Sequence, residues 1–133
     1  MIDHISLGVR DVKRAAAFYD AVLAPLGMKS VMRVDLPGRG LLAVAYGQDE
    51  QHPTFWVQLP INGDAASAGN GVHVAFAATD HAAVDAFYLA AMEAGGSDEG
   101  GPGHRVEYHP HYYGAFVRDP DGHKIEACCH APE

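Results

Sequence analysis

Two segments of the chain alternate bulky hydrophobic residues with small or polar ones, which predicts two strands of the same kind. The bulky residues fall on every second position of 5–9 and again of 72–76, the spacing of a strand with one buried face. The opposite face carries one histidine in each segment, His4 and His73, among small side chains. A face without bulk lines a cavity better than it fills a core, so we expect both histidines to face a cavity.

Each predicted strand leads into a predicted helix. Hydrophobic residues recur at helical spacing after Asp11 and again after Asp80. Both aspartates stand at the N-cap position, where a short carboxylate accepts the free backbone N–H groups of the first turn. Gly27 in the first half, and Gly95 with Gly96 in the second, provide the left-handed residue that ends a helix.

Short strands separated by turn residues follow each helix. The expected strands are 31–34, 41–46 and 54–59 in the first half and 105–108, 113–118 and 124–128 in the second. Pro, Gly and Asp mark the expected turns, at 37–38, 49–53, 100–103 and 119–122. Each half is therefore predicted to be a βαβββ module, the first about 1–61 and the second about 71–130, with a small, polar, glycine-rich linker at about 62–70.

The two halves resemble each other at an offset of 69 residues, the separation of His4 and His73. The other coinciding residues are Asp11 with Asp80, Phe18 with Phe87, Tyr19 with Tyr88 and Gly27 with Gly96. A fixed internal period is typical of duplicated architecture. The pattern predicts one α+β domain, residues 1–133, built from two tandem modules.

Composition narrows the possible partners and the compartment. The chain is 48% hydrophobic and 20% charged, which is ordinary for a globular domain, and its formal net charge of -8 disfavours nucleic acid and anionic lipid. Cys128 and Cys129 are adjacent, a spacing that rarely allows a relaxed disulfide, so we expect a reducing, cytoplasmic setting. The first strand begins close to Met1, and no apolar run is long enough for export or membrane insertion.

The candidate chemistry is a mononuclear metal site. Such a site needs deprotonated donors on rigid elements, which the two strand histidines, His4 and His73, satisfy. The last expected strand places Glu126 just after a hairpin turn, and the corresponding strand of the first half offers Gln58 if the hairpin loops differ by one residue. The competing interpretation of each histidine is a hydrogen-bonded strand residue, and that of Glu126 is a solvated carboxylate.

The run of aromatic and histidine residues at 109–113 leads into a predicted strand and could overhang the cavity. His111 or Tyr113 would then act as an acid, a base or a hydrogen-bond donor beside Glu126. A surface loop with incidental metal affinity explains the same residues equally well.

Three segments, 3–11, 17–23 and 115–126, resemble signatures of the vicinal oxygen chelate superfamily, which includes glyoxalases, bleomycin-resistance proteins and extradiol dioxygenases. The resemblance covers essentially the whole chain. It implies a glyoxalase-like fold in which paired modules form cupped, barrel-like mixed sheets around one divalent ion, Ni, Zn, Mn or Fe. His4, His73 and Glu126 match the family's ligand positions and Gln58 the fourth, where many glyoxalase I-like sites carry glutamate.

The resemblance implies three alternative functions for a small-molecule substrate. The leading one is a glyoxalase I-like lyase or isomerase whose substrate chelates the ion through adjacent oxygens, with Glu126 as base. The second is an Fe(II)-dependent extradiol-type dioxygenase using His4, His73 and Glu126, since two histidines and one carboxylate leave open positions on the iron. The third is a binding or resistance protein without catalysis. Family members of this length also imply a homodimer with sites shared between chains.

Overall fold

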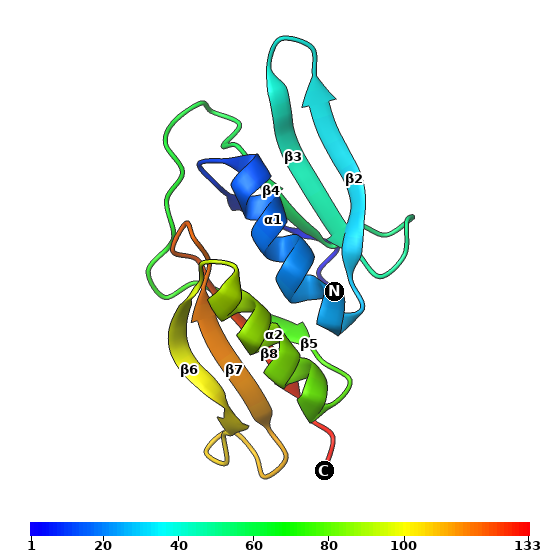
Figure 1. The fold of residues 1–133 in the computed structure, drawn as a ribbon, viewed down its shortest axis with the longest axis vertical. Coiled ribbons are helices and arrows are strands. Elements are labelled where there is room, and N and C mark those ends of the chain that lie inside the picture. The colour runs from blue at the N-terminus through cyan, green and yellow to red at the C-terminus, as the bar shows by residue number, and fades with distance from the viewer.

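The computed structural model describes residues 1–133 as two βαβββ modules (Figure 1). The elements of the first are β1 (Ile5–Gly8), α1 (Val12–Leu23), the short 3-10 helix η1 (Ala24–Leu26), β2 (Lys29–Leu36), β3 (Gly40–Gly47) and β4 (Phe55–Gln58). Those of the second are β5 (His73–Ala77), α2 (His81–Glu93), β6 (Ser97–His104), β7 (Tyr113–Arg118) and β8 (Lys124–Cys129). The predicted α+β class with two tandem modules is confirmed.

Each module forms a mixed four-stranded sheet of the same topology. The strand orders are β1-β4-β3-β2 and β5-β8-β7-β6. In both sheets the first and last strands of the module pair in parallel, and the remaining neighbours are antiparallel. The module's first strand therefore lies directly beside its last, which brings residues far apart in sequence onto one sheet face. No helix has the length and apolar character that a membrane crossing requires.

The predicted helix starts are confirmed by their capping contacts, whereas α1 ends at Leu23 and the predicted stop Gly27 caps η1. The Asp11 side chain accepts a hydrogen bond from the Arg14 backbone N–H at 3.1 Å, and Asp80 accepts one from that of Ala83 at 2.8 Å. Gly27 has a φ of 76°, in the left-handed region that only glycine adopts readily. Asp11 and Asp80 therefore have the same capping role in the two modules.

One predicted strand and one predicted turn are wrong. The segment 100–103 is part of β6, and 105–108 forms the turn that follows it. β6 is the outer strand of its sheet, and its pairing with β7 is interrupted by register shifts on both sides of Gly100. An outer strand with such irregularities accommodates Pro102 and several glycines, which would disrupt a central strand.

The two helices lie side by side on the same side of the molecule, each covering one face of its own sheet (Figure 1). Their buried faces and the covered sheet faces form a single hydrophobic core of 24 buried residues that runs through both modules. Phe55 of β4 meets Phe76 of β5 edge to face, with ring centroids 5.1 Å apart. Because each sheet has only one helix, its opposite face has no covering layer from its own chain.

Buried polar contacts join the modules. Tyr19 of α1 is 0% exposed and donates a hydrogen bond to Asp119 Oδ2 at 2.6 Å, and Asp119 lies in the turn between β7 and β8. In the same turn, the ring Nε2 of buried His123 lies 2.7 Å from the carbonyl oxygen of Gly8. Arg10 pairs with Asp121 there at 3.0 Å. These contacts fix the second module's hairpin against α1 and the end of β1.

We expect Tyr19→Phe to lower the free energy of unfolding by about 1–3 kcal/mol at neutral pH, because Asp119 loses a donor in a buried place. Burial, followed by the Asp119 carboxylate, raises the pKa of Tyr19 well above its ordinary value. The contribution is therefore complete below about pH 10 and is lost as the pH rises further, since only the unfolded state then releases the proton. Urea unfolding of wild type and variant at neutral and alkaline pH measures both effects.

Tyr46→Phe is the matched control. Tyr46 is also fully buried and burial also raises its pKa, but its hydroxyl donates to Ala16 and Asp20 within the first module. Both variants should reduce the alkaline loss of stability, whereas only Tyr19→Phe should weaken the junction between modules. Unchanged neutral stability of Tyr19→Phe would contradict the assignment of this contact as the junction.

Candidate metal centre

The uncovered face of the second sheet holds a buried carboxylate beside a histidine. β5 and β8 run parallel with His73 opposite Lys124 and Ala75 opposite Glu126, so His73 and Glu126 are diagonal neighbours on one face. His73 Nε2 lies 3.2 Å from Glu126 Oε1. Glu126 is 2% exposed, whereas 42% of the His73 side chain is exposed. An ionised carboxylate this deeply buried needs partners, and His73 is one of them.

The second partner of Glu126 is Tyr112. Its hydroxyl donates to Glu126 Oε2. Burial, followed by the hydrogen bond to Glu126, raises the pKa of Tyr112 well above its usual value, so the hydroxyl stays protonated at neutral pH. Gly114 makes room for this contact, because a Cβ there would lie 3.2 Å from both Glu126 Oε2 and the Tyr112 ring. Both oxygens of Glu126 are thus held, one by each neighbour.

Tyr112 takes the place that the sequence interpretation gave to Tyr113 or His111. Tyr113 pairs with Cys129 on the helix-covered face, donates to Asp85 of α2 at 2.7 Å and stacks on His81. His111 is exposed, and its hydrogen bond runs from its backbone N–H to His109. The alternation along β7 is the signal that could have identified Tyr112, since even-numbered positions there share the face of Glu126.

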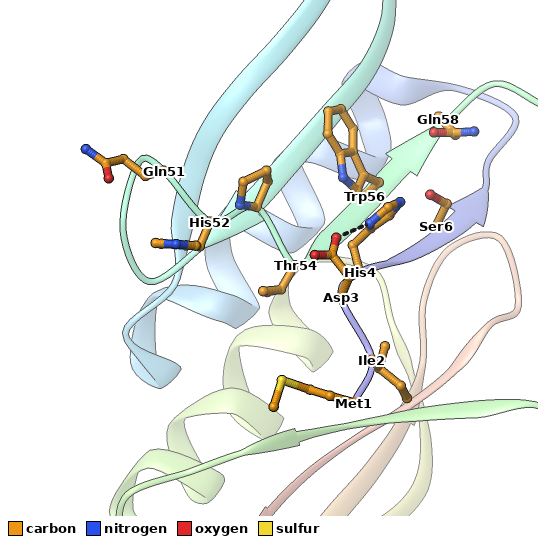
Figure 2. A pocket seen from close by; sticks show the side chains of 11 residues that line it. Met1, Ile2, Asp3, His4, Ser6, Gln51, His52, Thr54, Trp56 and Gln58 are labelled. Carbon is orange, nitrogen blue, oxygen red and sulfur yellow. Dashed lines mark hydrogen bonds and ion pairs between the residues drawn. The ribbon is translucent and has the colours of Figure 1, made fainter.

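The first sheet presents His4 in an open pocket of ≈ 580 Å³ on its uncovered face. Figure 2 shows His4 and Ser6 on the same side as Trp56 and Gln58 of β4. About half of the His4 side chain is exposed, and its Nδ1 lies 2.6 Å from Asp3 Oδ1. A carboxylate at Nδ1 orients the ring and leaves Nε2 as the nitrogen available for a metal.

The register corrects the expected equivalence of Gln58 and Glu126. Ser6 lies opposite Trp56, just as the repeat-related Ala75 lies opposite Glu126. Gln58 lies two pairs further along, opposite Gly8. The position equivalent to Glu126 in the first module is therefore Trp56, which cannot act as a ligand, and Gln58 lines the same pocket beyond it.

The candidate ligands form two pairs that do not converge within one chain. His4 and Gln58 line the pocket of the first sheet, and His73 contacts Glu126 on the second. Among His, Cys, Asp and Glu side chains of one chain, only His81, Cys129 and Glu133 bring three potential ligand atoms within 4.8 Å of one another. His4 therefore does not form a group of three potential ligands with His73 and Glu126 within one chain.

The donor geometry of the second sheet fits a divalent cation. Two neighbouring ligands about 2.1 Å from an octahedral ion are about 3 Å apart, close to the spacing of His73 Nε2 and Glu126 Oε1. The Tyr112 hydroxyl donates a hydrogen bond to Glu126, and Asp3 Oδ1 accepts one from His4 Nδ1; hydrogen bonds of this kind orient metal ligands. The residues present therefore suit a metal bound through imidazole and carboxylate.

Comparisons with known proteins agree with the fold. Residues 1–127 match the model of the Glyoxalase/Bleomycin resistance protein/Dioxygenase superfamily. A glyoxalase/bleomycin resistance protein from Albidiferax ferrireducens is 35% identical with a TM-score of 0.81, and the match covers 97% of this chain and 98% of that one. The chain belongs to this superfamily.

More distant structures share the fold. A glyoxalase-related enzyme from Fulvimarina pelagi is 21% identical with a TM-score of 0.70, over 97% of this chain and 87% of that one. A glyoxalase I variant from Zea mays is 24% identical with a TM-score of 0.67, and the match covers 96% of this chain but 46% of that one. No curated protein matches the sequence significantly.

We expect Tyr112→Phe to weaken Mn(II) binding by about 10–100-fold, because Glu126 loses the hydrogen bond that orients it. Mn(II) is the appropriate probe since it prefers oxygen and imidazole donors to thiolate. Tyr113→Phe is the matched control, as it removes a hydroxyl from the opposite face. Electron paramagnetic resonance of free Mn(II) measures the affinity, and equal affinities of the two variants would show that Tyr112 does not support the site.

Proposed function

We propose that the protein is a divalent-metal-dependent enzyme of the vicinal oxygen chelate type, a glyoxalase I-like lyase or isomerase for a small substrate with adjacent oxygens. His4 of one protomer and His73 with Glu126 of another would hold one Ni, Zn, Mn or Fe ion. The observation that carries the proposal is the buried Glu126 carboxylate, held between His73 and Tyr112 on a sheet face with no covering layer.

Two features support a site shared within a homodimer. First, several large hydrophobic side chains remain exposed, including Ile2, Met32, Leu59, Ile61, Val72 and Val106. Second, this chain matches 46% of the Zea mays glyoxalase I chain, so two copies together reach about the length of that protein. Burying the uncovered faces against a second copy would bring His4 toward His73 and Glu126.

In this proposal Glu126 is the group that moves a proton. Its carboxylate can accept the proton of a hydroxyl-bearing carbon next to a carbonyl group and return it to the carbonyl carbon, while the hydroxyl proton passes to the former carbonyl oxygen; the net result is an isomerisation. Tyr112 holds Oε2 and remains protonated, so it keeps the carboxylate oriented throughout. A bound divalent ion supplies Lewis-acid polarisation of the substrate's adjacent oxygens. Gln58 lines the same pocket as Trp56 and would contact the substrate there.

A second function is favoured by Trp56. With Trp56 at the position equivalent to Glu126, three protein ligands remain, His4, His73 and Glu126. Two histidines and one carboxylate leave three positions of an octahedral Fe(II) ion open, enough for a chelating catechol and dioxygen. An extradiol-type dioxygenase is therefore the alternative, with Tyr112 as the neighbouring hydroxyl.

A panel of metals and substrates tests the class of reaction. Protein loaded with Ni(II), Zn(II) or Mn(II) should isomerise thiohemiacetals, and Glu126→Gln should lower kcat at least about 100-fold while the fold is retained. Protein loaded anaerobically with Fe(II) and given catechols and then oxygen tests the alternative through oxygen uptake. Turnover only in the second assay would replace the lyase assignment, and inactivity in both would remove the enzymatic proposal.

Mixing two inactive variants tests whether the site is shared. His4→Ala and Glu126→Gln should each be inactive alone, but their heterodimer has one site with all three native ligands. A random mixture should recover about a quarter of wild-type activity, since half the dimers are mixed and each has one intact site of two. His73→Ala mixed with Glu126→Gln is the control, because both lesions lie in the same half of the site and no heterodimer is intact. A site within one chain would give no recovery in either mixture.

A further inference from the structure

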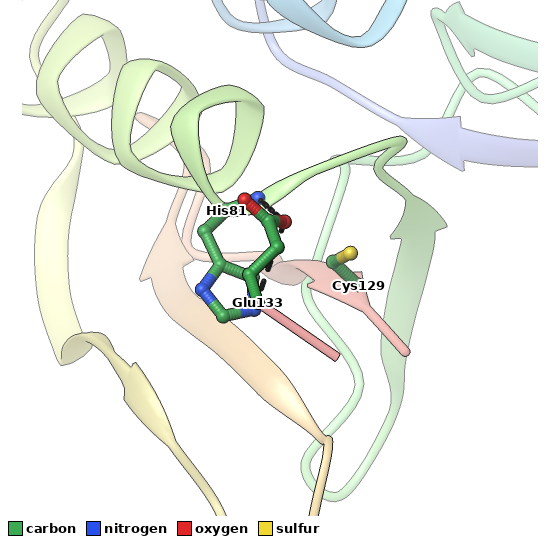
Figure 3. A group of neighbouring side chains, drawn as sticks. All are labelled: His81, Cys129 and Glu133. Atoms are coloured by element: carbon green, nitrogen blue, oxygen red, sulfur yellow. Dashed lines mark hydrogen bonds and ion pairs between the residues drawn. The ribbon is translucent and has the colours of Figure 1, made fainter. Parts of the chain in front are cut away.

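A second cluster of potential metal ligands lies on the helix-covered side of the second sheet. His81 stands in the first turn of α2, Cys129 ends β8, and Glu133 follows in the tail (Figure 3). One ligand atom from each residue lies within 4.8 Å of the other two. Successive side chains of β8 point to opposite faces of the sheet, so Cys129 points away from the face that carries Glu126 and Cys128. The cluster is therefore separate from the candidate metal centre.

The cluster leaves a buried nitrogen without a partner. His81 Nε2 is buried and makes no hydrogen bond, although it lies 3.8 Å from Glu133 Oε2. Such an orphaned polar atom is uncommon in a folded protein and calls for a ligand. The free thiol of Cys129 is 1% exposed beside it.

The imidazole ring of His81 is held in a fixed orientation. It stacks on Tyr113 with a centroid distance of 3.9 Å and an interplanar angle of 6°, and His104 packs against it edge on. Tyr113 is anchored in turn by its hydrogen bond to Asp85. A ring fixed by its neighbours loses little freedom when Nε2 binds a metal.

Distances and charges both suit a tetrahedral cation. Ligands of tetrahedral zinc are about 3.5 Å apart, given bonds of about 2.0–2.3 Å. The three ligand atoms lie within 4.8 Å of one another, and His81 Nε2 and Glu133 Oε2 are 3.8 Å apart, close to that value. A thiolate, a carboxylate and a neutral imidazole balance the two charges of the ion, which lowers the cost of holding it in a largely buried place.

We propose that His81, Cys129 and Glu133 form a second site for a thiophilic divalent cation of the Zn(II) type. The three ligands leave a fourth position for water. Binding joins the tail to the first turn of α2, where Glu133 Oε2 already accepts the backbone N–H of His81 at 2.8 Å. The Cys129 thiol releases its proton to solvent as it coordinates. This inference is independent of the proposed function, whose site contains no sulfur ligand.

Co(II) titration of the reduced protein tests the site, because a thiolate ligand gives a sulfur-to-cobalt charge-transfer band in the near ultraviolet. In the wild type, the intensity of this band should correspond to one thiolate-bound cobalt ion per chain. Cys129→Ser should abolish it, and Cys128→Ser, the adjacent thiol on the opposite face, should retain it. The band does not respond to metal at His4, His73 and Glu126, so the two sites are read separately.

Glu133→Gln provides a variant that keeps the fold, because Glu133 is exposed. It should weaken the cobalt affinity measured by the same band by at least about tenfold, since loss of a direct ligand exceeds loss of an orienting group. Circular dichroism confirms that each variant is folded. No band in the wild type, a band that depends on Cys128, or an affinity unchanged by Glu133→Gln would overturn the proposal.

Discussion

Each four-stranded sheet is covered by a single helix, and this constraint governs the rest of the structure. The helices α1 and α2 pack side by side over one continuous core, so the bulky strand residues that form this core face them. The opposite faces of both sheets have no layer from the same chain. The polar groups His4, His73 and Glu126 lie on those faces, together with Trp56, whereas a core would exclude such polar groups.

The buried Glu126 carboxylate is the most demanding feature of these faces. A carboxylate with 2% exposure is stable only if its oxygens are satisfied, and both His73 and Tyr112 serve that purpose. The absence of a side chain at Gly114 allows Tyr112 to reach it. The first module has no such carboxylate, since Trp56 occupies the equivalent place. The duplication has therefore been retained in the fold but has diverged in its chemistry.

The two faces of β8 illustrate how one strand can serve two chemistries. Glu126 and Cys128 face the uncovered side, whereas Cys129 lies under α2 near His81. The adjacent cysteines are therefore separated by the sheet and are both free thiols. Burial raises the pKa of Cys128, which keeps that thiol neutral beside Tyr112. Alternation along the strand thus places the Glu126 carboxylate and the Cys129 thiol on opposite faces of the sheet.

The sequence by itself determined the two modules, the N-caps at Asp11 and Asp80 and most of the strands, because these depend on local periodicity and capping chemistry. It did not determine β6, since an outer strand tolerates glycines and Pro102 that indicate a turn elsewhere. His4, His73 and Glu126 could be singled out as candidates, but their grouping could not. Only the tertiary structure decided that His73 contacts Glu126 and that Tyr112 donates a hydrogen bond to Glu126. It also decided that Trp56 occupies the position equivalent to Glu126 in the first module. The reason is that pairing register is set by contacts between strands distant in sequence.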